Sequence, residues 1–125
     1  MTYPLGRCYA NALMWATLHG GEVVHGSVLV NNVLRVKHAW VEGTHYDKTT
    51  RTMRVRFIDP TFGINAPRVA VDDGVPTARK DLHVFVSEPH VDHRYSVDEV
   101  WTLRAKHKHV GPFDRKRRTV VVSAS

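Results

Sequence analysis

The spacing of the apolar residues changes at Gly20-Gly21, and this change separates a helix from a set of strands. Before the glycines, apolar residues recur every three or four positions between Pro4 and His19, which is the period of one face of an α-helix. Proline suits the first turn of a helix, and a glycine just past the last turn ends many helices. The sequence therefore predicts one amphipathic helix over residues 4–19, with Cys8 in about its first turn.

Beyond the glycines, apolar residues alternate with other residues, as they do in β-strands. A first strand over residues 23–30 is predicted to end at Asn31-Asn32, because asparagine tolerates the positive φ angles of a tight hairpin turn. A second strand follows at residues 33–42, a polar turn at 42–50, a third strand at 51–59 and a loop at 59–67. Further strands are predicted at 68–71 and 82–87, with Asp73-Gly74 as the turn between them.

The last third of the chain begins with a helix signal. Ser96 and Glu99 have the spacing of a capping box, so a helix is predicted from Val97 to about Lys108 and stops before Gly111-Pro112. Residues 118–125 are expected to form a final strand or an ordered tail. A chain of 125 residues without repeats or linkers is about one domain long, so a single domain over residues 1–125 is predicted.

Composition narrows the protein class. The chain is 42% hydrophobic and 24% charged, as globular domains are, and no apolar run is long enough to span a bilayer. One cysteine cannot form an internal disulfide, and the N-terminus lacks the basic patch and apolar run of a secretory signal. We therefore expect a cytoplasmic protein that does not associate with membranes.

Positive charge is concentrated late in the chain. There are 18 lysines and arginines against 12 aspartates and glutamates, for a formal net charge of +6, and most of the excess lies in residues 104–118. Such a run is either a solvated surface or a patch that contacts a polyanion weakly. The residues that would make this contact are Arg115, Lys116, Arg117 and Arg118.

Two polar residues fall on the apolar faces of neighbouring strands. Because side chains alternate along a strand, His38 shares a face with Val36 and Trp40, and Asp59 shares one with Phe57. An ionised carboxylate is costly on an apolar face unless it is paired. We therefore expect Asp59 to accept a hydrogen bond from one ring nitrogen of His38, while the other nitrogen faces Cys8.

Such a row contains a nucleophile, a base and an orienting carboxylate. A thiolate is the attacking form of cysteine, and both an imidazolium and a helix N-terminus stabilise it. Each member also has a purely structural interpretation. Cys8 is then a small buried apolar residue, His38 a core histidine, and Asp59 the residue that starts the loop before Pro60.

Four motifs resemble the transglutaminase-like family within the papain-like cysteine enzyme superfamily: GRCYANA, VVHGSV, HAWVE and IDPT, which lie between residues 6 and 62. The resemblance implies a papain-like α+β fold, with the thiol on an N-terminal helix that packs on an antiparallel sheet. It also implies that Cys8 is the nucleophile, His38 the base and Asp59 the orienting residue, with Trp40 packed beside the histidine.

Only seven residues precede Cys8, fewer than in many members of this family, so the donor to an oxyanion must be sought locally. Tyr3, the backbone N–H of Cys8 and Asn11, about one helical turn along, are the candidates.

The predicted function is that of a thiol-dependent hydrolase or acyltransferase, such as a cysteine peptidase, an amidase or a transglutaminase-like enzyme. Its substrate would be a peptide, a protein or a small amide or acyl compound, and it needs no metal or organic cofactor. The alternative is a catalytically silent domain of the same fold that binds nucleic acid or a protein through the basic region. A metal site is not expected, because the candidate ligands lack a thiolate and helical histidine spacing; they are His83, His90, Asp92 and His93.

Overall fold

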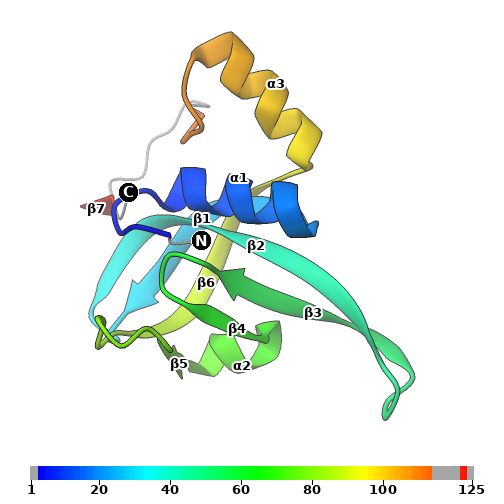
Figure 1. Cartoon of the computed structure of the whole chain (residues 1–125). Helices are drawn as coiled ribbons and strands as arrows, with labels where there is room; N and C mark the ends of the chain where they lie inside the picture. The colour runs from blue at the N-terminus through cyan, green and yellow to red at the C-terminus, as the bar shows by residue number, and fades with distance from the viewer. Residues whose placement is uncertain (1–2, 114–121, 124–125) are drawn as a thin grey trace.

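The computed structural model describes residues 3–113 and 122–123, and over these residues the fold is α+β (Figure 1). An N-terminal helix, α1 (Cys8–His19), packs on an antiparallel sheet, and a second long helix, α3 (Val97–His107), lies against α1 on the side away from the sheet. The sheet order is β4 (Ile64–Pro67), β3 (Thr52–Asp59), β2 (Leu34–Asp47), β1 (Glu22–Val30), β6 (Phe85–Tyr95) and β5 (Val75–Pro76). A short helix, α2 (Arg68–Asp73), follows β4, and β7 (Val122–Ser123) pairs with β2 in parallel.

Helix α1 begins at Cys8, four residues later than predicted. Gly6 has a φ of 80°, which no right-handed helix contains, so the chain turns at residues 5–6 and the helix cannot begin before them. The predicted end is confirmed, because Gly20 follows the last turn with a φ of 91° and donates its N–H to the carbonyl of Ala16. The later start makes Cys8 the first residue of the helix.

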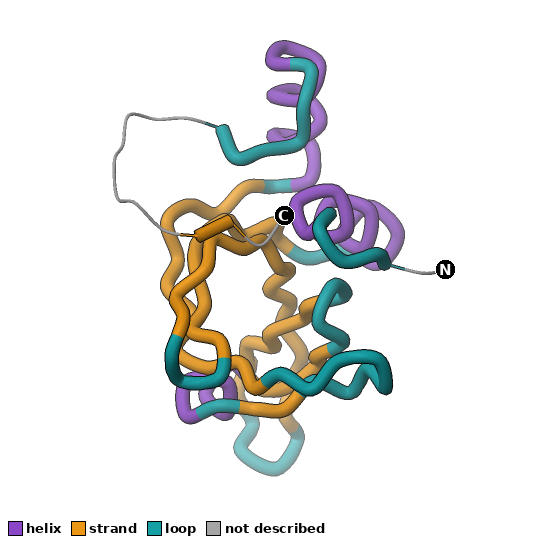
Figure 2. The backbone as a smooth tube through the Cα atoms, turned by 90° about the vertical axis from the view of Figure 1, so that its left-hand side faces the viewer, coloured by secondary structure: helices purple, strands orange, loops and turns teal. Residues whose placement is uncertain are grey.

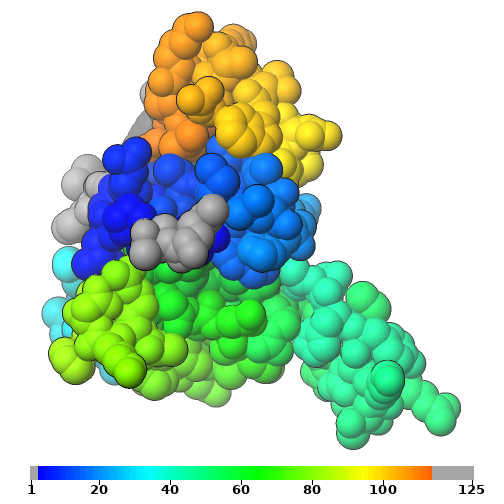
Figure 3. All heavy atoms as spheres, in the orientation of Figure 1, coloured from blue at the N-terminus to red at the C-terminus, as the bar shows by residue number. Residues whose placement is uncertain are grey.

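The hairpin between β1 and β2 is confirmed, with positive φ angles of 53° and 59° at Asn31 and Asn32. The turn predicted at residues 42–50 is wrong for its first part, because β2 continues to Asp47 and is paired with β3 from Val41 to Asp47. The outer half of this pair is a two-stranded arm that stands clear of the body (Figure 3). Its residues are mostly polar because both faces of the arm meet solvent, and this polarity made the strand look like a turn.

The strand predicted at residues 68–71 is wrong, since these residues belong to α2. Val71 of this helix is fully buried while Val69 is exposed, so one apolar face was mistaken for an alternating strand. The predicted loop at 59–67 contains β4, and the strand predicted at 82–87 is instead β6, which starts at Phe85 and runs to Tyr95. The capping box of α3 is confirmed by reciprocal hydrogen bonds between Ser96 and Glu99.

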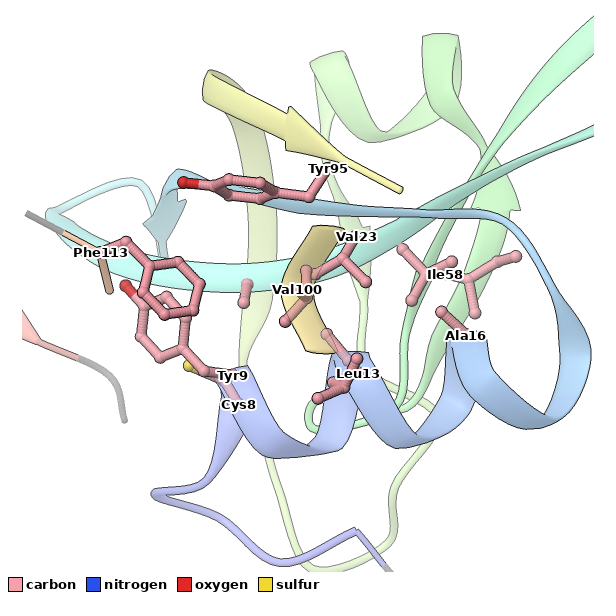
Figure 4. Packing of buried hydrophobic residues seen from close by; sticks show 12 residues of the cluster. Cys8, Tyr9, Leu13, Ala16, Val23, Ile58, Tyr95, Val100 and Phe113 are labelled. Carbon is pink, nitrogen blue, oxygen red and sulfur yellow. The ribbon is translucent and has the colours of Figure 1, made fainter. Parts of the chain in front are cut away.

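Buried apolar clusters lie on both faces of the sheet. Figure 2 shows how strongly the strands curve. One apolar cluster lies between the sheet and α1, where Leu13 and Ala16 face Val23 and Ile58 (Figure 4). The other lies on the opposite face and includes Val71 of α2; its strand residues include Val24, Val28, Val36, Trp40, Phe57 and Val86. None of the helices in the described residues is long and apolar enough to cross a membrane.

Candidate active site

His38 on β2 and Asp59 at the end of β3 form a hydrogen bond inside the protein. Nε2 of His38 lies 2.6 Å from Oδ2 of Asp59, and neither side chain has any exposed surface. The hydrogen bond expected from the strand pattern is therefore confirmed. The second carboxylate oxygen, Oδ1, accepts the backbone N–H of Phe62 at 3.0 Å. Both oxygens of the buried carboxylate are thus paired, as a buried charge requires.

Aromatic rings hold the imidazole of His38 in place. The ring of Phe62 stacks on it with centroids 4.6 Å apart and planes inclined by 17°, and Trp40 lies next to it along the strand at 6.3 Å. Gly26 of β1 lies opposite His38 of β2. A side chain at position 26 would collide with the carbonyl of His90 and press on Trp40. The orientation of the imidazole is therefore set by packing as well as by its carboxylate partner.

The remaining ring nitrogen of His38, Nδ1, is buried and makes no hydrogen bond of normal geometry with any described group. Burial alone lowers the pKa of His38, but the charge and hydrogen bond of Asp59, followed by the nearby thiol of Cys8, outweigh it and raise the pKa to about 10. His38 is therefore an imidazolium at neutral pH. The thiol of Cys8 is thus one of the groups that keep His38 protonated.

Cys8 lies at the N-terminal end of α1, in the same apolar cluster as Tyr9 and Phe113 (Figure 4). The first N–H groups of a helix have no partner within the helix, and the dipole places partial positive charge there. Both effects stabilise a thiolate. They also leave the backbone N–H of Cys8 as a candidate donor to an oxyanion.

The other predicted site residues have different surroundings. Nδ2 of Asn11 donates to the carbonyl of Pro4 and to Oγ1 of Thr61, both at 2.8 Å, so neither amide proton of Asn11 is free for an oxyanion. Trp40 is fully buried beside His38, the packing position that the family resemblance implies. Tyr3 is half-buried just before Cys8, and its carbonyl accepts a hydrogen bond from another part of the chain.

That donor is Arg79, for which no motif in the sequence predicts a role. Its Nη1 donates to the carbonyls of Tyr3 at 2.8 Å and Thr61 at 2.7 Å, and so ties the segment before Cys8 to the loop after Asp59. Phe62 was also missed, although it directly follows the IDPT motif. A turn that presents an N–H to an aspartate three residues earlier is a recognisable local signal, whereas the contact of Arg79 depends entirely on tertiary structure.

The candidate site is closed in this structure. Cys8, His38 and Asp59 have no exposed surface, and a hollow of about 610 Å³ lies elsewhere, over β1, β2 and β6. The segment before Cys8 and the loop after Asp59 lie beside the site and are held together by Arg79. A substrate can reach the thiol only if a part of this covering moves.

Replacing Arg79 with methionine should accelerate alkylation of Cys8 by iodoacetamide. Each lost hydrogen bond is worth about 1 kcal/mol, so opening should become about fivefold to thirtyfold more frequent. Intact-mass kinetics at one pH measure the rate. Arg79→Met also removes two hydrogen bonds to Asp81, which do not tie the covering together. Arg56→Met is the control, because it removes two hydrogen bonds to Asn65 and none to the segment before Cys8. Equal rates in the two variants would show that Arg79 does not restrain the covering.

The other histidines show no metal-binding arrangement: the described residues contain no group of three or more histidine, cysteine or acidic side chains placed to hold an ion. Nε2 of His90 lies 3.6 Å from Asp92, and the ring of His93 packs on Tyr95. His25, which the sequence did not single out, is buried among aromatic rings; burial and then the charge of His93 lower its pKa to about 3. His25 is therefore neutral at physiological pH.

The basic residues 115–118 lie outside the described residues, so the structure does not bear on a polyanion contact there. Comparisons of the chain with protein-family models, with curated proteins and with solved structures find no match. The function is therefore inferred from the surroundings of Cys8, His38 and Asp59.

Proposed function

We propose that the protein is a thiol-dependent hydrolase or acyltransferase of papain-like, transglutaminase-like type that acts on an amide or related acyl bond. The observation that carries the proposal is the buried hydrogen bond between His38 and Asp59, together with Cys8, which begins a helix and helps to raise the pKa of His38. Burying an ion pair seldom increases stability over well-packed apolar residues. A chemical role is therefore the better explanation for this pair.

The reaction would proceed in two steps. Sγ of the Cys8 thiolate attacks the acyl carbon, and the imidazolium of His38 gives its proton to the departing amine as the carbon–nitrogen bond breaks. A thioester remains on Cys8. Water in hydrolysis, or an amine in transfer, then attacks the thioester and loses a proton to His38, which restores the thiolate–imidazolium pair. Asp59 keeps the imidazole in place and stabilises its charge throughout.

The pH profile of Cys8 alkylation tests this proposal. An ordinary thiol has a pKa of about 8.5, so its reaction slows tenfold for each pH unit below that value. A thiolate paired with the His38 imidazolium should instead react at nearly its full rate at pH 6 to 7. Rates are normalised to the plateau at high pH, because burial slows the reaction at every pH.

A silent domain of the same fold, which binds nucleic acid or a protein through its basic residues, is the second candidate. The observation that favours it is the lack of exposed surface on Cys8. If the pH profile of Cys8 alkylation is that of an ordinary thiol and a panel of acyl-trapping probes gives no adduct, the enzymatic function is contradicted and the silent domain is favoured. Peptide mapping of any adduct identifies whether Cys8 carries it.

A further inference from the structure

The edge of β2 beside the candidate site is left open by its neighbour β3. The two strands pair from Val41–Ile58 to Asp47–Thr52, so β3 provides no partner for residues 34–40 of β2. Part of this stretch is instead paired with β7 in parallel, with Val36 opposite Val122 and Lys37 opposite Ser123. An extended segment from elsewhere in the chain thus already occupies this edge.

The open edge adjoins the candidate site. His38 shares its face with Val36 and Trp40 of one apolar cluster, whereas Cys8 belongs to the cluster under α1 on the opposite face. A side chain on one face can meet a group on the other only around an edge of the sheet. For the Cys8 thiol to meet His38, it must do so around the edge that β7 extends, one residue beyond the paired Lys37.

The charge along this edge is not balanced. Lys37 lines the hollow over β1, β2 and β6 together with three carboxylates, and each carboxylate already lies near a basic side chain: Asp72 pairs with Arg68, Glu88 pairs with Arg35, and Asp92 lies 3.6 Å from Nε2 of His90. Among the described residues, Lys37 has no ion-pair partner. Residues opposite each other on paired strands place their side chains on the same face, so an acidic residue opposite Lys37 would be favoured.

We propose that this edge of β2 is a peptide-binding site, which takes an extended segment by parallel strand addition and prefers an acidic residue opposite Lys37. In a parallel strand, the peptide residue after the one opposite Lys37 lies level with His38. The proposed reaction needs the substrate's acyl bond at that position. Main-chain hydrogen bonds supply affinity in this mode, and side-chain neighbours supply specificity. β7 occupies the site within the same chain and competes with the substrate. The inference uses the proposed function only to say what happens to the bound peptide.

Peptide binding to the full chain tests the inference without any chemistry, because Cys8→Ala is present in every variant. The probes are fluorescein-labelled TVVVSA, which copies residues 119–124, and TVVVEA, which places glutamate opposite Lys37. Val122→Pro takes a backbone N–H out of β7 and disfavours its pairing, and Val122→Ala keeps the N–H. The Val122→Pro chain should bind both probes more tightly than the Val122→Ala chain. It should bind TVVVEA about fivefold more tightly than TVVVSA, a preference that Lys37→Met abolishes.

Amide exchange provides the second measurement. Residues 34–40 should exchange faster in the Val122→Pro chain than in the Val122→Ala chain, and the glutamate probe should slow them again. Equal exchange and equal peptide uptake in the two chains would overturn strand addition at this edge. Equal affinity for the two probes would overturn the acidic preference. Because Cys8 is replaced throughout, a loss of binding speaks against the peptide site, whereas the alkylation profile of the unmodified chain tests the proposed function separately.

Discussion

Cys8→Ser should abolish turnover while it leaves the fold intact. The alcohol is a far weaker nucleophile than a thiolate and does not ionise beside the imidazolium, so no acyl-enzyme forms. The hydroxyl takes the place of the thiol near Nδ1 of His38, a buried atom without a hydrogen bond, and can supply the missing partner. We therefore expect the free energy of unfolding to change by less than about 1 kcal/mol.

Acyl-trapping probes followed by intact-mass analysis measure the activity of this variant, and denaturant unfolding measures its stability. Met14→Ser is the control, because it places serine on an exposed part of the same helix and should retain full labelling. A buried apolar role for Cys8 predicts the opposite pattern: a clear loss of stability from the polar substitution and no labelling in either protein. That pattern would contradict a catalytic role.

Asp59→Asn should reduce turnover by about two to four powers of ten. The amide keeps the size of the carboxylate but removes the negative charge that stabilises the imidazolium. It can also present an N–H where His38 needs an acceptor, which favours the wrong tautomer. Without Asp59, burial dominates and the pKa of His38 should fall far below its value of about 10. Alkylation of Cys8 near neutral pH should slow accordingly.

NMR titration of the His38 ring measures the pKa in both proteins. Stability gives an independent check, because the pKa of His38 is raised from 6.5 in the unfolded chain to about 10 in the folded one. The stabilisation from the imidazolium is complete below pH 6.5 and is lost as the pH rises towards 10. Melting temperatures at pH 6.5 and 9 should therefore differ more in the parent than in the variant.

Asp47→Asn is the matched control for this experiment. Asp47 also accepts backbone N–H groups, from Thr49 and Thr50, but it lies in the exposed arm away from the site. Full activity in Asp59→Asn, or an unchanged pKa of His38, would mean that Asp59 only begins the loop at Pro60.

Local patterns in the sequence determined the features that depend on a few neighbouring residues. Gly20 ends α1 because it adopts a positive φ at little cost, and Asn31-Asn32 forms a hairpin turn for a similar reason. The pairing of His38 with Asp59 also followed from the sequence. Alternation along each strand assigned both residues to apolar faces, and a buried carboxylate needs a partner.

Tertiary structure alone decided which segments pair and what covers the site. The polar arm of β2 and β3 is a strand pair because its backbone groups satisfy each other, whatever its side chains are. Residues 68–71 belong to a helix because this helix packs the side chain of Val71 against the sheet. Arg79 restrains a segment 76 residues away, and β7 fills an edge that exists only because β3 ends early. Such contacts depend on where the folded chain brings distant residues, and no local pattern encodes that.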